Sequence, residues 1–238
     1  MGVNAVTAMV EESPERIVRG WVNKSSERIE KIVKSLEEVG VPIEWSDNRA
    51  LDRRSAGVRH QGVIVEFLAS EPIDLGALQE RVEHAHQPLL LVLDGVTDPH
   101  NLGACMRSAA AAGAVAVVVP RDRAAGLTPV TRRAAAGAAE RVPLAVVTNL
   151  ARALSALAEL GVWRVGLAGD GQTSLYQADL AGPLALILGS EERGLRRLTR
   201  EHCDQLVRIP MVGAMESLNV SVAAGISLFE ALRVRSIQ

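Results

Sequence analysis

An asparagine and an arginine stand close together in the segment Leu93–Arg107, where an apolar run gives way to polar and small residues. Pro99 and Asn101 suit a turn, and Asn101 is a residue type that caps helices. Arg107 follows on a stretch otherwise rich in alanine, glycine and serine. A guanidinium in such surroundings needs an anionic partner. The residues leave two alternatives open: a structural ion pair, or contact with an anionic ligand.

A second segment places glycine and acid residues directly after an apolar run. Leu184–Leu188 is typical of a buried strand, and Gly189, Ser190 and Glu191 follow it. Gly189 permits close approach of another backbone, and Glu191 is a carboxylate that can pair with Arg107. The alternative is a simple turn with solvated acids.

The third segment, Ile209–Gly225, joins an expected strand to a long helix. The strand is expected to end at Pro210, and the helix is expected to begin near Ser217–Asn219. Small residues in the first turns of that helix would let another backbone pack closely. Helix packing after an ordinary cap is therefore the alternative to a ligand-binding role.

The elements that position these segments follow from the apolar pattern after Pro88. Continuous apolar runs are typical of strands buried on both faces, and helical stretches separate most of them. This alternation predicts an α/β fold with a mainly parallel sheet covered on both sides, which binds ligands at the carboxyl ends of its strands. The expected strands are Leu89–Leu93, Ala114–Val119, Pro143–Val147, Trp163–Leu167, Leu184–Leu188 and Leu206–Ile209, and the expected helices are Leu102–Ala112, Val130–Ala139, Leu150–Leu160 and Val220–Val234.

The N-terminal part predicts a smaller α/β unit. Pro72, Gly76 and Pro88 surround one short helical stretch, which is typical of a linker. We therefore expect a domain at residues 1–70, a linker at 71–87 and a second domain at 88–238. The smaller unit is expected to contain helices at Val3–Val10 and Ser26–Val39, the second capped by Ser26, and strands at Arg16–Val22, Val41–Trp45 and Val63–Phe67.

Composition limits the classes of function. Aromatic residues make up 3% of the chain, which excludes a broad stacking platform, and a net charge of −2 means that RNA binding would need a local basic surface. We expect no membrane span, no signal peptide and no metal site, and the separated Cys105 and Cys203 suit free thiols in a reducing cytoplasm. The sequence lacks a G-x-G-x-x-G after its first buried strand and lacks a P-loop, which argues against a nucleotide-binding oxidoreductase.

Taken together, the three segments resemble the signature motifs of the SpoU (TrmH-like) family of the SPOUT superfamily. Asn101-Leu102-Gly103 with Arg107 is similar to motif 1, Leu186–Glu191 to motif 2, and Ile209-Pro210-Met211 through Ser217–Ser221 to motif 3. The longer stretches Leu93–Cys105, Leu195–Asp204 and Leu218–Leu232 are similar to bacterial enzymes that methylate the 2′-oxygen of guanosine in 23S rRNA. The N-terminal part, through Gly2–Val6 and His60–Val63, resembles the substrate-binding domain of these enzymes, which is similar to a small ribosomal-protein fold. One departure is Glu192-Arg193, where the family pattern has Gly-Glu.

The resemblance implies S-adenosylmethionine as cofactor, a homodimer whose interface lies against the cofactor site, and a deep trefoil knot in the C-terminal domain. Arg107 is implied to activate the ribose 2′-hydroxyl, and because arginine normally stays protonated, we favour electrostatic activation over a base role. Glu191 would orient Arg107, and Asn101, Ser217 and Asn219 would position the substrate. The cofactor is expected against Leu188, Gly189, Ile209, Met211 and Leu218.

The expected partner is 23S rRNA, with no membrane partner and a cytoplasmic location. RNA contacts are expected from the N-terminal domain, from Arg121, Arg123, Arg132 and Arg133, and from Arg193, Arg196, Arg197 and Arg200, which a helix would place on one face; a solvated face is the alternative. Two other functions stay open. They are 2′-O-methylation of a tRNA guanosine by the same chemistry, and a non-catalytic RNA-binding role in ribosome assembly.

Overall fold

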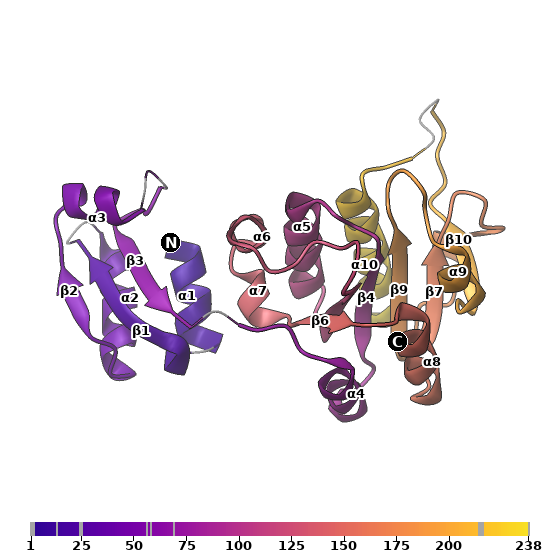
Figure 1. Cartoon of the computed structure of the whole chain (residues 1–238), viewed down its shortest axis with the longest axis horizontal. Helices are drawn as coiled ribbons and strands as arrows, with labels where there is room; N and C mark the ends of the chain where they lie inside the picture. The colour runs from indigo at the N-terminus through magenta and orange to yellow at the C-terminus, as the bar shows by residue number, and fades with distance from the viewer. Residues whose placement is uncertain are drawn as a thin grey trace. The chain divides into compact units, whose positions relative to one another are not determined.

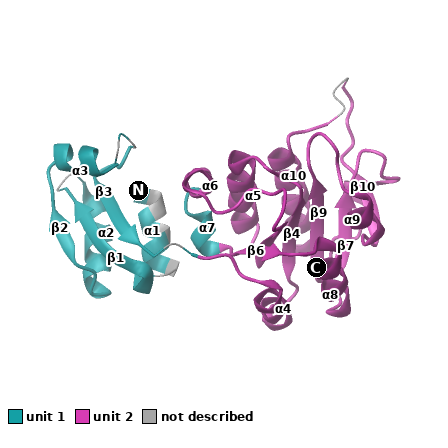
Figure 2. Ribbon diagram, viewed as in Figure 1, with its two compact units in different colours: residues 1–70, 136–141 teal, residues 71–135, 142–238 magenta. Residues whose placement is uncertain are grey.

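The structure is a computed structural model that describes residues 3–12, 14–23, 26–55, 57, 59–68, 70–213 and 217–237. It contains two compact units (Figure 2). Residues 1–70 and 136–141 form the first unit, and residues 71–135 and 142–238 form the second. The first unit is built mainly from the N-terminal segment, and the second contains the three motif segments.

The first unit is a three-stranded sheet with helices. The sheet has the order β2-β1-β3, with β1 (Ile17–Val22) parallel to β2 (Ile43–Trp45) and antiparallel to β3 (Val63–Phe67). The predicted helices and strands are confirmed as α1 (Val3–Glu12), α2 (Glu27–Glu38) and these three strands, although Ser26 makes no side-chain cap bond. The helix α3 (Asn48–Ser55) was not predicted, because it buries only Leu51 and Ser55 and shows little apolar periodicity.

The second unit confirms the predicted α/β class. Its seven-stranded sheet has the order β6-β5-β4-β9-β7-β10-β8, and every neighbouring pair is parallel. Strands β4 and β9 lie side by side in its middle, which fits their continuous apolar sequences. The strands are β4 (Leu89–Asp94), β5 (Ala116–Pro120), β6 (Leu144–Val147), β7 (Trp163–Leu167), β8 (Thr173–Ser174), β9 (Leu184–Gly189) and β10 (Gln205–Arg208).

Helices cover both faces of this sheet (Figure 1). On one face, α4 (Leu75–His84) and α8 (Leu150–Glu159) pack Leu78, Val82 and Leu154 against alternate residues of the strands. On the other, α5 (Pro99–Ala111) and α10 (Val220–Arg235) pack against each other and against β5 and β9. The burial of a central sheet from both sides is the main source of its stability.

Residues 71–87 lie in the second unit. Ile73 forms a β-bridge with Ala145, and α4 contributes Leu78 and Val82 to the core. The core of the second unit therefore includes residues that precede β4.

Two helix predictions are wrong. The expected helix Val130–Ala139 is divided into α6 (Pro129–Ala135) and α7 (Ala138–Arg141), because Ala136 and Gly137 have positive φ angles of 51° and 94°. Arg193, Arg196, Arg197 and Arg200 do not share one helical face, because α9 spans only Arg197–Glu201 and Arg196 is its N-cap. Arg193 lies in the preceding turn.

Strand β10 is attached to β7 by an ion pair that also bonds to the backbone. Asp204 Oδ2 accepts hydrogen bonds from the Arg164 backbone N and Nε, both at 2.8 Å, and Oδ1 accepts one from a terminal nitrogen at 2.5 Å. The hydrogen bonds from Arg164 lower the pKa of the Asp204 carboxyl. Because the folded state favours the ionised form of Asp204, the pair stabilises the fold above the ordinary carboxyl pKa. This stabilisation is lost as pH falls through the lowered pKa.

We predict that Asp204→Asn lowers the Tm of the second unit by about 2–4 °C near pH 7, as expected for about 1 kcal/mol in a partly exposed pair. The difference from wild type should shrink below about pH 4 as the native carboxylate becomes protonated. Thermal melts followed by circular dichroism from pH 2.5 to 7 measure this. The control Asp122→Asn removes a carboxylate whose nearest cation is 3.8 Å away and should leave Tm unchanged; a constant difference at every pH would contradict the assigned cause.

Candidate functional site

The first two motif segments meet at the carboxyl ends of β4 and β9. These strands are parallel neighbours, and Asp94 is in register with Gly189. The loops that follow them therefore begin side by side, as expected for a ligand site at this edge of a parallel sheet.

The side chain of Glu191 joins all three motif segments. Its Oε1 accepts hydrogen bonds from Asn101 Nδ2 at 3.3 Å, from Asn219 Nδ2 at 2.6 Å and from the Val220 backbone N at 3.1 Å. Asn219 Nδ2 is also 3.0 Å from Asn101 Oδ1, and Asn219 Oδ1 caps α10 at the Ser221 backbone N. One carboxylate and two amides thus fix the starts of α5 and α10 relative to β9.

The predicted cap of α5 is wrong. Asp98 is the N-cap, with Oδ1 2.9 Å from the His100 backbone N, and Pro99 occupies the first turn. Asn101 lies within the helix, so its side chain is available for Glu191.

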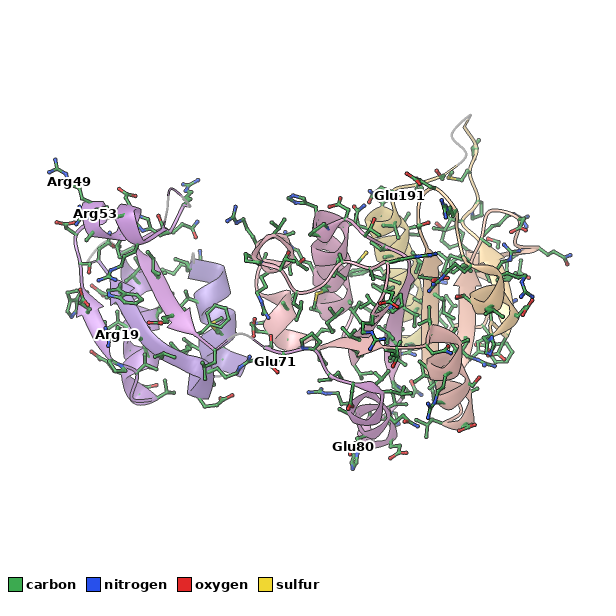
Figure 3. The ribbon with its side chains drawn as sticks, viewed as in Figure 1. Arg19, Arg49, Arg53, Glu71, Glu80 and Glu191 are labelled. Carbon is green, nitrogen blue, oxygen red and sulfur yellow. The ribbon has the colours of Figure 1, made fainter. Side chains whose placement is uncertain are left out.

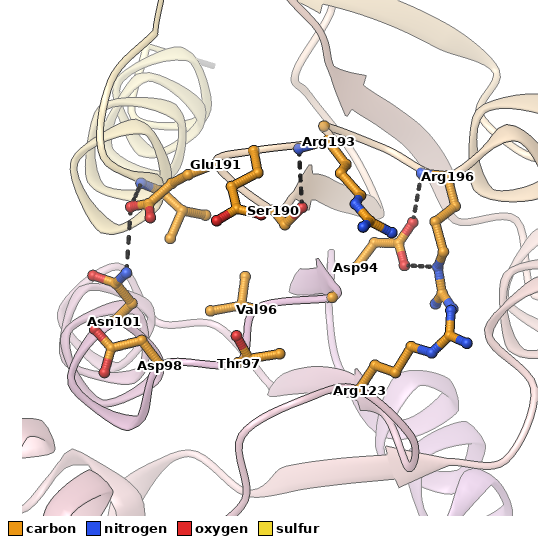
Figure 4. Close-up of a pocket in the computed structure, with 14 residues that line it drawn as sticks. Asp94, Val96, Thr97, Asp98, Asn101, Arg123, Ser190, Glu191, Arg193 and Arg196 are labelled. Carbon is orange, nitrogen blue, oxygen red and sulfur yellow. Dashed lines mark hydrogen bonds and ion pairs between the residues drawn. The ribbon is translucent and has the colours of Figure 1, made fainter.

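A pocket of about 360 Å³ opens beside this network (Figure 4). Its buried carboxylate is Asp94, which accepts hydrogen bonds from the Arg196 backbone N at 2.9 Å and from Arg196 Nε at 2.5 Å. Sequence reasoning did not single out Asp94, although an acid that ends a fully apolar strand was the available signal. The lining residues are Asp94, Gly95, Val96, Thr97, Asp98, Asn101, Arg123, Ser190, Glu191, Glu192, Arg193, Gly194, Arg196 and Val220.

Gly189 is required by the turn that follows β9. A Cβ at this position would overlap the backbone of Gly194 and Leu195. The turn is closed by a 2.8 Å hydrogen bond from the Gly194 backbone N to the Ser190 carbonyl oxygen. The missing side chain thus lets the turn fold back over the strand end, and this fixes where Glu191 lies.

The other residues predicted for the cofactor lie outside the pocket just described. Leu188 is buried at the end of β9, Ile209 and Leu218 are half-buried, and Met211 is exposed. Ser217, predicted to position substrate, is also exposed beside this group. The part of the predicted loop at residues 214–216 lies outside the described residues. The ends of β9, β7 and β10 are nevertheless adjacent, with Leu188 in register with Leu167 and Leu167 with Val207.

Arg107 is exposed on α5, and it makes no hydrogen bond or ion pair with the residues that the structure describes. The expected pairing with Glu191 is therefore absent, since the hydrogen bonds of Glu191 go to Asn101, Asn219 and Val220. The structural ion pair that the sequence left open for Arg107 is not formed among these residues.

The two cysteines are unsuited to act as nucleophiles. Burial, together with the nearby charge of Glu191, raises the pKa of the Cys105 thiol to about 12. Burial raises the pKa of Cys203 to about 11. Both thiols are thus protonated at neutral pH, and the reactive form of cysteine is the thiolate.

Two kinds of feature are absent from the described residues. Among them, no group of three or more histidine, cysteine or acidic residues could hold a metal ion. None of the helices in the described part of the chain has the length and apolar character needed to cross a membrane.

The fold and the pocket define an α/β protein with a polar binding site at the carboxyl edge of a parallel sheet. The chain belongs to the SpoU rRNA methylase family, whose sequence model matches residues 88–229. A second model, described as RNA 2′-O ribose methyltransferase substrate binding, matches residues 1–73.

The chain is similar to other proteins over its whole length. The 23S rRNA (guanosine-2′-O-)-methyltransferase RlmB of Pseudomonas putida is 50% identical over 240 residues, which cover 100% of this chain and 96% of that protein. The enzyme of the same name from Escherichia coli K12 is 49% identical over 237 residues, covering 99% and 98%. The SpoU methyltransferase AviRb from Streptomyces viridochromogenes, solved in complex with the cofactor AdoMet, has a TM-score of 0.78 and 25% identity, covering 100% of this chain and 90% of that one.

We predict that Glu191→Ala lowers the kcat/KM of methyl transfer by about 100-fold, because the starts of α5 and α10 lose their common acceptor and small displacements of a reacting geometry cost about that much. Glu191→Gln keeps an acceptor oxygen at the same place and should retain most of the rate. The control is Glu159→Ala, which removes an exposed carboxylate at the end of α8, away from the pocket and with no hydrogen bond to the described residues. Steady-state assays with labelled donor compare the variants; equal losses at residues 191 and 159 would refute the positioning role of Glu191.

Proposed function

We propose that this protein transfers the methyl group of S-adenosylmethionine to the ribose 2′-hydroxyl of a guanosine in 23S rRNA. The observation that carries the proposal is the 50% identity to the 23S rRNA (guanosine-2′-O-)-methyltransferase RlmB of Pseudomonas putida, over 100% of this chain and 96% of that protein. The three motif segments, joined through Glu191, support a shared chemistry. An rRNA substrate also implies a cytoplasmic location.

The donor site is assigned to the ends of β9 and β10, which lie on either side of β7, and to the loop after β10. Apolar side chains that suit an adenine ring are available there, because Ile209 and Leu218 are only half-buried and Met211 is 37% exposed. Leu188 and Gly189 supply the strand end beside them. When bound, S-adenosylmethionine supplies a methyl group on a sulfonium, which is a good leaving group.

The protein's task is to present the hydroxyl in line with that methyl group and to favour loss of its proton. Arg107 is the proposed activating residue. Its exposure and its lack of a partner among the described residues leave the guanidinium available for a phosphate or a developing alkoxide. Asn101, Glu191 and Asn219 act as positioning residues, and so does Ser217, which precedes Asn219 by two residues in the chain.

The first unit is the proposed RNA-binding domain. Its helix α3 carries Arg49 and Arg53, which project outward (Figure 3). Arg54 lies over the ring of Trp21, with its guanidinium carbon 4.4 Å from the ring centroid. A cluster of arginines on one short helix provides the local basic surface that an acidic chain needs for phosphate contacts. The proposed boundary of this domain follows residue 70, and the proposed catalytic domain is the second unit, which begins at residue 71.

The proposed assembly is a homodimer. Helix α10 exposes the large apolar residues Val222, Phe229 and Leu232, and α5 packs beside it. Exposed apolar side chains on one helix are typical of a surface that another chain covers. The trefoil knot likewise stays a prediction from the family resemblance.

The function is tested by incubating the purified protein with labelled S-adenosylmethionine and either unmodified 23S rRNA or bulk tRNA. The modified nucleotide is then mapped by primer extension at low nucleotide-triphosphate concentration. Label at one guanosine 2′-oxygen of 23S rRNA is expected. Label in tRNA alone would replace the proposal with tRNA methylation, and RNA binding without any transfer would favour a non-catalytic role.

We predict that Arg107→Ala reduces methyl transfer by about 100- to 1,000-fold, because a charge that acts on the developing alkoxide is lost. Donor affinity, measured by calorimetry, should stay within about twofold, since Arg107 lies on α5 and the donor site lies at the ends of β9 and β10. Arg81→Ala, on α4 at the other face of the sheet, serves as control. Normal turnover of the Arg107 variant would remove this residue from the mechanism.

We predict that residues 71–238 alone stay folded and bind S-adenosylmethionine, but lose at least about tenfold in affinity for RNA. The physical reason is that all three motifs and the core partners Leu78 and Val82 are retained, while the basic helix α3 is removed. Light scattering, donor calorimetry and RNA binding measure this. A second truncation that begins at Pro88 should melt lower because it lacks α4; undiminished RNA affinity of the first truncation would contradict the domain assignment.

A further inference from the structure

The charged residues of the pocket are segregated between its two ends (Figure 4). Asp98, Asn101 and Glu191 lie together at one end, where α5 begins. Arg123, Arg193 and Arg196 lie toward the other end, around Asp94. A ligand that fits this arrangement has an anionic group on one side and hydrogen-bond donors on the other.

The acids at the first end already have donors from the protein. Asp98 accepts from the His100 backbone N, and Glu191 accepts from two amides and a backbone N–H. Glu192 is the remaining carboxylate of the lining, and it is exposed to solvent.

The cationic end has more guanidinium groups than carboxylates. Arg196 is neutralised by the buried Asp94. The side chains of Arg123 and Arg193 have no hydrogen-bond or ion-pair partner among the described residues. Two unpaired guanidiniums beside a third are mutually repulsive unless an anion lies between them, and phosphate is the anion whose geometry matches this fork.

Both unpaired arginines are held by short, hydrogen-bonded turns. Arg123 has a positive φ of 58°, an unfavourable conformation for this residue, in a loop tied to the first motif segment by a 2.9 Å bond from the Ala125 backbone N to the Val96 carbonyl oxygen. The Arg193 backbone N is 3.3 Å from Ser190 Oγ. The two side chains thus start from fixed positions on opposite sides of the pocket, as expected for a preorganised anion site.

We propose that Arg123 and Arg193 together bind a backbone phosphate of the nucleotide that is methylated, so that its ribose lies toward Asn101 and Glu191. This inference rests on the proposed function, because it places the substrate RNA in this pocket. The volume of about 360 Å³ lies in the range of pockets that hold one small ligand. A nucleotide also meets the polarity of the pocket, with phosphate at the arginines and sugar hydroxyls at the acids and amides.

The test uses the full-length double variant Arg123→Gln/Arg193→Gln, with full-length 23S rRNA transcript as the probe. The matched control is Arg81→Gln/Arg152→Gln, which removes two exposed arginines from α4 and α8 on the same unit. Binding is measured between about 50 and 300 mM salt. The pocket variant should reduce the magnitude of the slope of log K against log salt by about 0.7–0.9, the change for one lost phosphate contact.

The kinetic result should agree with the binding result. The pocket variant is expected to lower kcat/KM for rRNA by about 100-fold, with the Kd for S-adenosylmethionine unchanged, and the control variant should behave as wild type. An unchanged donor Kd also shows that the variant is folded. A pocket variant with the salt slope and kcat/KM of the control would overturn the proposal.

A charge-conserving variant separates phosphate binding from recognition of the base. Arg123→Lys/Arg193→Lys keeps two cations that can bind phosphate, but it loses the planar fork that reads the N7 and O6 edge of guanine. Recovery of the salt slope by the lysines supports the phosphate, and failure to recover it overturns that assignment. If wild-type protein methylates no RNA, the proposed function fails, whereas the salt slopes still test the arginine pair.

Discussion

One oxygen of the Glu191 carboxylate joins the turn after β9 to the starts of α5 and α10, which are far apart in the chain. Its position depends on the backbone below it. Because Gly189 has no side chain, the turn after β9 can fold back over the strand end, and the carboxylate then reaches Asn101 and the start of α10. The starts of both helices on this face of the sheet are therefore fixed by a single group. A carboxylate oxygen that accepts hydrogen bonds from an α5 side chain, an α10 cap and a backbone N–H has little freedom to move, and its geometry is correspondingly rigid.

The parallel sheet was predictable because its strands are buried on both faces and their apolar sequences are continuous. Strand β4 and strand β9 were located almost to the residue for this reason. The exposed helix α3 and the division between α6 and α7 were not predictable in this way. In α3 few side chains are buried, and at Ala136 a residue without special preference adopts a positive φ that only the tertiary structure imposes. Local sequence patterns predict helices and strands whose side chains are buried, because burial requires apolar residues at regular spacing. They do not predict elements that bury few side chains.

The candidate site shows the same limit. That Asn101, Glu191 and Asn219 share a site could be expected from strand ends that meet at one edge. The hydrogen bonds between these groups could not be predicted. Asp98 rather than Asn101 caps α5, and the Asn101 amide is therefore available to Glu191. Net charge was also a poor guide. A chain of net charge −2 still gathers Arg123, Arg193 and Arg196 around a single buried carboxylate, because electrostatic recognition depends on local arrangement.

The position of Arg107 on α5 limits how this residue can contribute to the site. Asn101 lines the pocket and Arg107 does not. Six residues along an α-helix correspond to about 9 Å of rise and about 120° of rotation, so the two side chains leave α5 in different directions. The activating role proposed for Arg107 would therefore be fulfilled at a site to which a second copy of the chain contributes. The exposed Phe229 and Leu232 on the neighbouring α10 favour this arrangement, because a chain that covers them also covers the flank of α5. A homodimer would in this way bury apolar surface and bring an otherwise solvent-exposed guanidinium into a confined space, where its charge acts more strongly on a reacting oxygen.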